Sequence, residues 1–232
     1  MPRVIVGTPF NIVNRHHIER WVNFHSRYAD GLVVSIDANE IVTLADEIRF
    51  MKSRKVGIIG VKLEHPNSLN KKIVVIDAMK SLKPEWMGII PCDETFTENF
   101  FDRCDDMFKD KKYLWYSFPV AHLWGDEKHH RVDSWWEAGM TNVRENKKFW
   151  QNVWEKYDYI DNGFHSPLPP AQVVYDHRGQ FIKDIIVKHY AFLDPKDWDR
   201  RCKVYGDEYE FGGGKQNFAP LEKVELRELA HG

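Results

Sequence analysis

The sequence of 232 residues lacks any run of about 18 uninterrupted apolar residues, the length that a membrane-spanning helix needs. Its first residues, Met1-Pro2-Arg3-Val4, lead into a strand-like segment without the apolar core of a signal peptide. Cysteine is scarce: the three residues, Cys92, Cys104 and Cys202, have spacings that match no zinc or redox motif, which excludes a disulfide scaffold. These absences predict a cytoplasmic protein without a membrane partner.

Neither sign of charge dominates, since 33 Lys and Arg face 35 Asp and Glu for a net charge of -2. The field of the whole molecule therefore does not attract nucleic acid, although a local basic groove is compatible with this balance. Hydrophobic residues make up 43% and aromatic residues 14% of the chain, which excludes a disordered protein and predicts a packed globule.

Short apolar runs rich in β-branched residues alternate with segments of helical period through the first half of the chain. The expected strands cover 4–6, 31–36, 56–61 and 86–90, and the expected helices lie near 18–25, 41–51, 73–82 and 100–108. This order is typical of an α/β protein with a mostly parallel central sheet.

The second half is rich in aromatic residues and histidine and predicts a mixed C-terminal part. Strands are expected at 172–175 and 185–187, a helix from Asp194, and a short helix within 221–229. We expect a single domain over 1–211 and a C-terminal tail over 212–232.

Polar residues follow three of the expected parallel strands: Thr8-Pro9 after the first, Asp37 after the second, and Asp93-Glu94 after the fourth. Because the carboxyl ends of parallel strands meet at one edge of a sheet, these groups are expected in one crevice. Each cluster taken alone is also compatible with a turn or a helix cap.

The order of these segments resembles the family-2-like glycosyltransferases of the GT-A fold, over about Val4 to Tyr205. The segments that carry the resemblance are a first strand ending in Gly-Thr-Pro, the aspartate of Ser35-Ile36-Asp37-Ala38-Asn39, the run Trp86 to Phe96, and Val187-Lys188-His189-Tyr190. The resemblance implies a nucleotide-binding half over 1–110 and an acceptor-binding half over 111–211. It also implies transfer of a sugar from a nucleoside diphosphate donor, expected to be a UDP-sugar, to an acceptor hydroxyl with inversion.

A metal ion, Mn²⁺ or Mg²⁺, is expected from the same resemblance, because a hard cation neutralises the diphosphate. Asp93 is the first expected ligand and His189 the second, although a lone histidine after an apolar strand can equally be structural. Glu94 could bind the metal, hold the acceptor or cap the following helix. The chain departs from the family in having Pro91 where the first aspartate of Asp-x-Asp would stand, which leaves weak or absent metal binding open.

For the donor, the resemblance implies Thr8 and Pro9 around the base or ribose and Asp37 on the base, where it could instead cap the helix beginning near Glu40. Arg144 and Lys203 are the donor-binding cations, with Lys188, Arg200 and Arg201 also available; most of these are compatible with a solvated face.

The general base is not fixed by spacing: Asp161 is the first candidate, His165 the second and Asp126 the third. Trp124 is a candidate platform for the acceptor, with core packing as the alternative. The histidines His122, His129 and His130 match no zinc pattern and are expected at the surface.

The acceptor is open among a glycan, a small molecule and a hydroxymethylated DNA base. A catalytically degenerate nucleotide-binding module is the rival hypothesis, which Pro91 favours. Nucleotidyl transfer is disfavoured, because no Gly-rich phosphate loop with a signature lysine follows the first strand.

Overall fold

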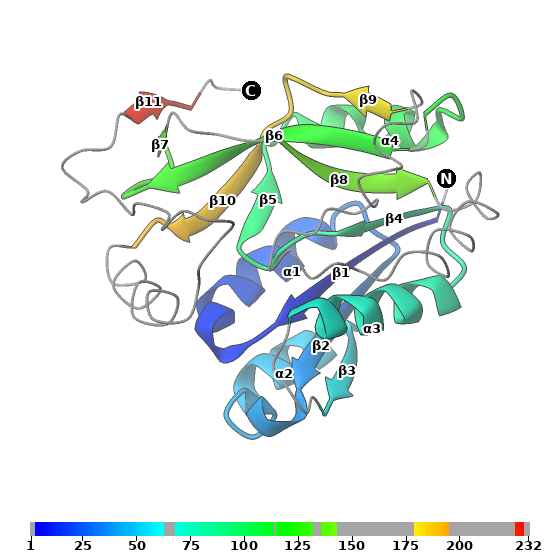
Figure 1. Ribbon diagram of the computed structural model, residues 1–232, viewed down its shortest axis with the longest axis vertical. Helices are drawn as coiled ribbons and strands as arrows, with labels where there is room; N and C mark the ends of the chain where they lie inside the picture. The colour runs from blue at the N-terminus through cyan, green and yellow to red at the C-terminus, as the bar shows by residue number, and fades with distance from the viewer. Residues whose placement is uncertain are drawn as a thin grey trace, which may run out of the picture.

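The computed structural model describes residues 3–62, 68–113, 115–131, 136–142, 179–194 and 226–229. At its centre, four parallel strands form the order β4-β1-β2-β3 (Figure 1). They are β1 (Val4–Phe10), β2 (Gly31–Asp37), β3 (Gly57–Val61) and β4 (Trp86–Ile89). The predicted α/β class with a mostly parallel central sheet is confirmed.

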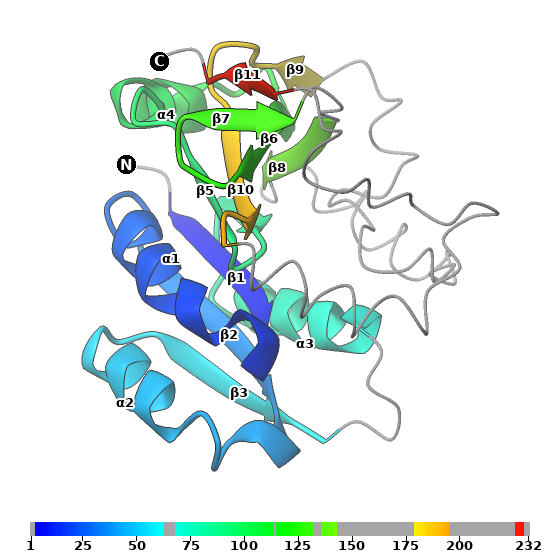
Figure 2. The ribbon, with the colours of Figure 1, turned by 90° about the vertical axis from the view of Figure 1, so that its left-hand side faces the viewer.

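Helices cover both faces of the parallel strands (Figure 2). The helices α1 (Ile18–His25), α2 (Ala45–Ser53) and α4 (Phe100–Lys109) contribute to one core, and α3 (Ser68–Ser81) contributes to the other. Successive side chains of β1 point to opposite faces of the sheet, so that Val4 and Val6 lie in the first core and Ile5 lies in the second. Two 3₁₀ helices, η1 (Ile12–His17) and η2 (Ala38–Glu40), follow β1 and β2.

Strand β1 is longer than its sequence suggested, because it continues through Gly7, Thr8 and Pro9 instead of turning there. Gly7 is needed for packing: a Cβ at this position would lie 2.3 Å from Cγ1 of Val75 on α3. Pro9 stays in register with Ser35 of β2. It is tolerated because residues 7 and 9 direct their backbone groups to the β4 side, as the bond from the N–H of Ile90 to the carbonyl of Gly7 shows, and the pairing with β4 ends at Gly7 and Ile89.

The mixed part is built on a long strand, β6 (Trp115–Trp124), which pairs antiparallel with β8 (Trp136–Asn142), and β8 pairs antiparallel with β4. Strand β10 (Val187–Phe192) lies between β6, to which it is parallel, and β5 (Glu94–Phe96), to which it is antiparallel. The mixed C-terminal part is thereby confirmed.

Three short strands complete this part: β7 (His129–Arg131), β9 (Gly179–Phe181) and β11 (Leu226–Glu228). The short helix expected within 221–229 is wrong over 226–228, where the chain pairs antiparallel with β7. The strand expected at 185–187 begins at Val187. The strand expected at 172–175 and the helix expected from Asp194 lie outside the described residues.

An aromatic cluster joins α4 to the strands beneath it. Phe100 stacks on Phe96 of β5, with ring centroids 4.3 Å apart, and Phe96 meets Phe118 of β6 edge to face. The indole Nε1 of Trp86 donates to the carbonyl of Phe108 at 2.8 Å. The parallel sheet and the mixed part therefore share one core.

Over the ranges that the structure describes, no helix has the length and apolar character needed to span a membrane.

Candidate functional site

The sheet reverses its direction of growth between β1 and β4. The chain moves outward from β1 to β2 and β3, then returns across the sheet through α3 to place β4 on the other side of β1. The segments that leave β1 and β4 at their carboxyl ends therefore diverge, and such a switch point is where open α/β sheets bind ligands. After β4 the chain enters a tight turn that carries Asp93.

Asp93 is held by backbone hydrogen bonds on both sides of the turn. The N–H of Glu94 donates to the carbonyl of Pro91 at 3.0 Å, which closes the turn, and the N–H of Tyr190 on β10 donates to the carbonyl of Asp93 at 2.8 Å. The residue is only 4% exposed. The backbone of Asp93 is thus fixed next to β10, and its carboxylate is buried there.

Three titratable residues form one row across β5, β10 and β6. His189 pairs in register with Glu94 on one side and with His122 on the other. Two residues earlier on β10, Val187 pairs with the apolar Phe96 and Val120 in the same way. Because residues two apart share a face, an apolar row is followed directly by an ionisable one.

His122 belongs to this row and is buried, at 6% exposed, so the expectation of a surface histidine is wrong for this residue. The signal was its position near the end of a mostly apolar run, 115–124, which is typical of a strand buried on both faces. His129 and His130, with which it was grouped, lie beyond the turn at Gly125 on a different strand.

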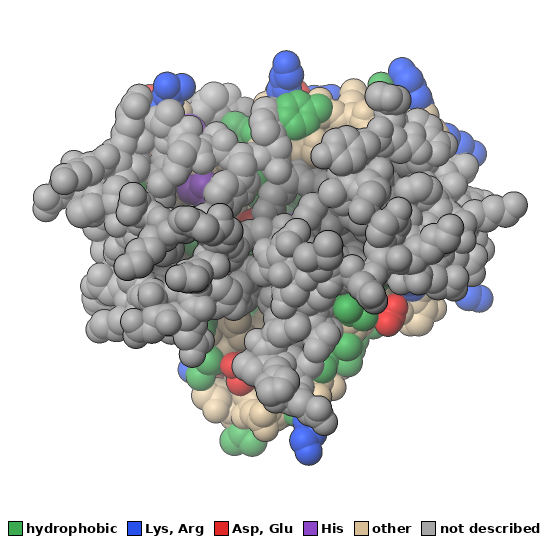
Figure 3. All heavy atoms as spheres, in the orientation of Figure 1, with side chains coloured by type: hydrophobic (Ala, Val, Ile, Leu, Met, Phe, Trp, Pro, Cys, Tyr) green, Lys and Arg blue, Asp and Glu red, His purple; other side chains and the backbone are tan. Residues whose placement is uncertain are grey.

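The side chains of the row make a short chain of contacts with Asp93. The Nε2 atom of His189 lies 3.5 Å from Oδ2 of Asp93, and Nδ1 of His189 lies 2.6 Å from Nδ1 of His122. The first distance exceeds the 2.7–3.2 Å of a good N–H···O bond, whereas the second is a short hydrogen bond. On the face drawn in Figure 3, histidine and carboxylate side chains are visible over the region of β5, β6 and β10.

The pair of Asp93 and His189 fits a divalent cation. Two ligands that each lie about 2.1 Å from one ion are about 3.0 to 3.4 Å apart, close to the separation seen here. A carboxylate oxygen with one imidazole nitrogen is a suitable donor set for a first-row divalent ion. Within the described ranges, no group of three or more His, Cys, Asp or Glu could hold a metal ion, so further ligands would come from substrate oxygens or water.

Helix α1 supports the turn from below. The indole Nε1 of Trp21 donates to the carbonyl of Ile90 at 3.0 Å, and Nε2 of His25 lies 3.2 Å from the carbonyl of Glu94. A carbonyl can only accept, so Nε2 carries the proton and Nδ1 accepts from the hydroxyl of Tyr28 at 2.6 Å. Burial lowers the pKa of His25 to about 3 and raises the pKa of Tyr28 well above its ordinary value.

The opposite face of β10 is packed against α1. The guanidinium of Arg20 lies 4.0 Å from the ring centroid of Tyr190 and pairs with Glu127 at 3.2 Å. The hydroxyl of Tyr190 is 3.1 Å from Oγ1 of Thr95 on β5, and burial raises its pKa. These contacts fix the strand that presents His189 on its other face.

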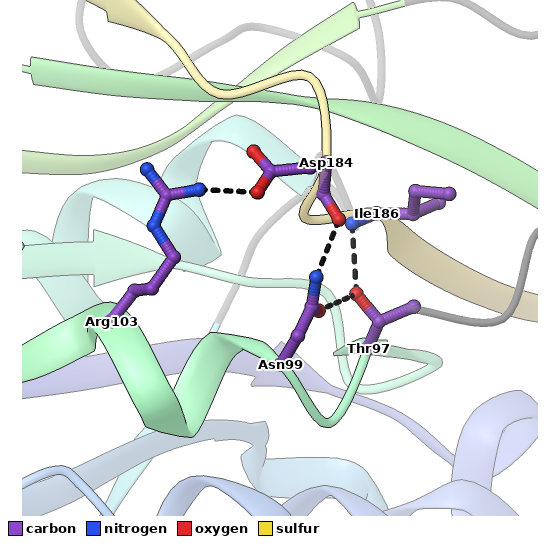
Figure 4. Close-up of polar contacts among 5 residues, drawn as sticks. All are labelled: Thr97, Asn99, Arg103, Asp184 and Ile186. Carbon is purple, nitrogen blue, oxygen red and sulfur yellow. Dashed lines mark hydrogen bonds and ion pairs between the residues drawn. The ribbon is translucent and has the colours of Figure 1, made fainter.

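The segment that leads into β10 is bound to the start of α4 (Figure 4). The hydroxyl of Thr97 accepts the N–H of Ile186 at 3.0 Å, and Nδ2 of Asn99 donates to the carbonyl of Asp184 at 2.6 Å. Arg103 pairs with the carboxylate of Asp184 and lowers its pKa. The position of β10 therefore depends on α4 as well as on α1.

The donor-binding candidates Thr8, Pro9 and Asp37 lie at the same edge, at the ends of β1 and β2. Thr8 is fully buried and its hydroxyl donates to the carbonyl of Pro9 at 3.2 Å. Asp37 is 8% exposed, and its Oδ1 accepts the N–H of Asn39 at 2.9 Å as the N-cap of η2. Asp37 is thus a cap, as the alternative had it, but of η2, which ends at Glu40, and not of a helix that begins there. Recognition of the base stays a prediction, since a carboxylate has about four acceptor positions.

The acceptor candidates Glu94 and Trp124 are both buried. Glu94 stands in the ionisable row, and Trp124 is 4% exposed on β6, which favours the core-packing alternative for the indole.

Asp126, the third candidate for the general base, accepts the N–H groups of Lys128 and His129 in an exposed turn, and its hydrogen bond with the His129 ring lowers its pKa. Four of the candidates, Asp161, His165, Arg144 and Lys203, lie outside the described residues.

No protein-family model matches the chain, and no curated protein matches it. Among solved structures it is similar to the mannose-1-phosphate geranyltransferase from Thermus thermophilus, at 6% identity and a TM-score of 0.39, over 88% of this chain and 60% of that chain. It is also similar to a 4-diphosphocytidyl-2C-methyl-D-erythritol synthase, at 12% identity and a TM-score of 0.40, over 62% of this chain and 76% of that chain. The chain thus spans about 60% of the length of the first of these proteins.

Proposed function

We propose that the protein is a GT-A-type glycosyltransferase that moves a sugar from a nucleoside diphosphate donor, UDP-linked, to an acceptor hydroxyl. The observation that carries the proposal is the meeting of Asp93 and His189, with Nε2 and Oδ2 3.5 Å apart, at the carboxyl edge next to the switch point between β1 and β4. A buried carboxylate beside an imidazole at this edge is suited to holding a cation against a diphosphate.

Each candidate has a chemical role in this proposal. Asp93 and His189 would hold Mn²⁺ or Mg²⁺, which when bound neutralises the charge that develops on the leaving diphosphate. Asp37 would accept an N–H of the base, Thr8 and Pro9 would contact the base or ribose, and Arg144 and Lys203 would bind phosphate oxygens. Glu94 and Trp124 would contact the acceptor. Asp161 or His165 would take the proton of the attacking hydroxyl, as transfer with inversion requires.

The donor site can be tested with a thermal-shift panel of nucleoside diphosphates and their sugars, with and without Mn²⁺. At a ligand concentration one hundred times Kd, stabilisation of about 2.7 kcal/mol is expected. We expect UDP and UDP-sugars to give the largest shifts, and the Asp93→Asn variant to lose the part of the shift that depends on Mn²⁺. Absence of any response to any nucleotide would contradict the proposal.

Hydrolysis and transfer assays distinguish the proposed glycosyltransferase from the rival function, a nucleotide-binding module without transfer. Its supporting feature is Pro91 at the place of the first aspartate of the motif, where a proline offers no ligand. We expect slow hydrolysis of the UDP-sugar without acceptor in the wild type. Binding of nucleotide with no hydrolysis and no transfer would favour the degenerate module.

The acceptor class can be assigned by assaying glycans, small-molecule alcohols and hydroxymethylated duplex DNA in parallel. If the acceptor is DNA, the affinity for DNA must fall steeply with salt, with a log-log slope of about -0.9 per phosphate contact. The reason is that contacts of Lys188, Arg200, Arg201 and Lys203 with phosphates would release counterions from the DNA. Hydrolysis of the donor without labelling of DNA at any salt concentration would remove DNA from the possible acceptors.

The cytoplasmic location and the division of the chain at 211 stay predictions of the sequence.

A further inference from the structure

The strongest unexplained contact at the site is the one between the rings of His189 and His122. Their Nδ1 atoms are 2.6 Å apart, and the ring planes are inclined by 75°, so the rings meet edge-on and do not stack. Two ring nitrogens at this distance require one proton between them, because two lone pairs or two N–H groups would repel. The direction of this hydrogen bond decides what the other nitrogen of His189 can do.

Two directions are possible for neutral rings. If His122 donates, His189 carries its own proton on Nε2, which then faces Oδ2 of Asp93 over 3.5 Å and has no lone pair for a cation. If His189 donates, its Nε2 keeps the lone pair, directed toward the same carboxylate. The 3.5 Å separation is a poor N–H···O distance but a suitable one for two ligands of one ion.

We propose that His122 is a positioning residue that accepts the Nδ1–H of His189 and thereby directs the lone pair of Nε2 toward the cation position beside Asp93. This inference rests on the proposed function, because it concerns the cation that Asp93 and His189 would share. Ligating histidines usually donate their second N–H to a fixed acceptor, which sets the tautomer and orients the ring. Here the acceptor is Nδ1 of His122, on the strand next to β10.

The fold delivers this acceptor rigidly. His122 lies directly across from His189 in the parallel register of β6 and β10, two residues beyond the pair of Val120 and Val187 and on the same face. Both apolar neighbours are in the core, and His122 is itself buried, so its ring has little freedom to turn away. A cation ligand held by such a support loses less conformational entropy on binding than an exposed histidine would.

The direction of the bond can be measured by NMR of the imidazole nitrogens in the metal-free protein, with His122→Asn and His189→Asn used for assignment. We expect the Nδ1 of His189 to carry hydrogen and the Nδ1 of His122 to accept it. A His189 ring that is protonated at Nε2 and bare at Nδ1 would overturn the positioning role.

The consequence for the cation can be measured as the affinity for Mn²⁺ alone, from the free-ion EPR signal, in a matched pair of variants. Asparagine places an amide oxygen where histidine has Nδ1, so His122→Asn keeps the acceptor, whereas His122→Leu places a methyl group there. We expect His122→Leu to bind Mn²⁺ about 10- to 100-fold more weakly than the wild type, and His122→Asn to keep most of the affinity. Thermal unfolding of each variant controls for loss of structure.

The outcomes separate this inference from the function on which it rests. Wild-type affinity in His122→Leu, or an equal loss in both variants, would overturn the positioning role while Asp93 and His189 remained a metal pair. A wild-type protein that binds no Mn²⁺ would overturn the metal assignment and the positioning role with it, but would leave nucleotide binding and transfer to be decided by their own assays.

Discussion

His25 of α1 donates a hydrogen bond from Nε2 to the backbone carbonyl of Glu94 at 3.2 Å, and so connects the first helix to the strand that follows Asp93. The ring is neutral, because its Nδ1 needs a lone pair to accept the hydroxyl of Tyr28 at 2.6 Å. The ring is buried, and protonation would place an uncompensated charge in the core. The folded protein therefore favours the neutral form of His25.

This relationship predicts a pH dependence of stability. The pKa of His25 is lowered from 6.5 to about 3 by burial, so between these values the unfolded chain binds a proton that the folded chain excludes. The free energy of unfolding should therefore be highest above pH 6.5 and fall with decreasing pH, by up to about 1.4 kcal/mol per pH unit from this group. Urea denaturation from about pH 4 to 8 measures the slope.

The matched controls are His25→Gln and His129→Gln. Replacing His25 removes the buried titrating group and should flatten the curve between about pH 4 and 6.5 relative to the wild type. His129 begins β7 with a side chain that is 38% exposed, and it pairs with Asp126, whose pKa is lowered from 3.8, so its replacement should leave the wild-type slope above about pH 5. Equal slopes in the wild type and in His25→Gln would contradict the assignment of a neutral, buried His25.

A second prediction concerns the carboxylate of the candidate metal pair. Asp93→Asn keeps the shape of the side chain but removes the charge that a cation needs, so Mn²⁺ affinity and sugar transfer should be abolished while the free energy of unfolding stays near that of the wild type. Isothermal titration with Mn²⁺ and a transfer assay with UDP-sugar measure the two losses. Asp105→Asn, an exposed aspartate on α4, is the control. Wild-type turnover in Asp93→Asn would rule out Asp93 as a metal ligand.

The sequence was sufficient for the parallel half of the fold, because each βα unit there is encoded locally. Apolar runs such as 31–36 and helical periods such as 18–25 correspond to β2 and α1 almost residue for residue. The convergence of Asp37 and Asp93 on one edge follows from the rule that parallel strands end together. These features depend on neighbours in the chain, and a single sequence carries them.

The ionisable row could not be predicted in this way, because its members meet through strand pairing between distant segments. His122 and His189 are brought together by the parallel register of β6 and β10, and Glu94 joins them through the antiparallel register of β5. Register is set by packing of the whole sheet and shifts every side chain to the other face when it slips by one residue. A local pattern around His122 therefore identifies a buried strand but not its partner.

A third prediction separates the two roles of Asp37. Its Oδ1 caps η2 through the N–H of Asn39, and loss of such a cap costs about 1 kcal/mol. Asp37→Ala should therefore lower the free energy of unfolding by about that amount and also raise the KM for the UDP-sugar more than the KM for the acceptor. Asp37→Asn should keep the cap, since an amide oxygen can accept the same bond. A change confined to the acceptor KM would place the nucleotide elsewhere, and a loss of stability alone would leave Asp37 only as a cap.

The last prediction tests whether α4 positions the candidate metal pair through the segment that precedes β10. The hydroxyl of Thr97 accepts the N–H of Ile186 at 3.0 Å and donates to Oδ1 of Asn99 at 2.6 Å, as Figure 4 shows. In Thr97→Val the side chain keeps its shape but leaves that partly buried N–H without its acceptor, which should cost about 1 kcal/mol or more of unfolding free energy. Because His189 follows three residues after Ile186, Mn²⁺ affinity should fall as well.

Two control variants test whether the effect comes from the hydroxyl of Thr97. Thr97→Ser keeps the hydroxyl and should retain the Mn²⁺ affinity of the wild type despite losing a methyl group. Arg103→Gln removes the pairing with Asp184, which is largely solvent-exposed and should contribute at most about 1 kcal/mol, lost as the pH falls through the lowered pKa of Asp184. The expected order of destabilisation is Thr97→Val above Arg103→Gln. A Thr97→Val variant that is destabilised but binds Mn²⁺ like the wild type would show that this hydrogen bond supports the fold without positioning His189.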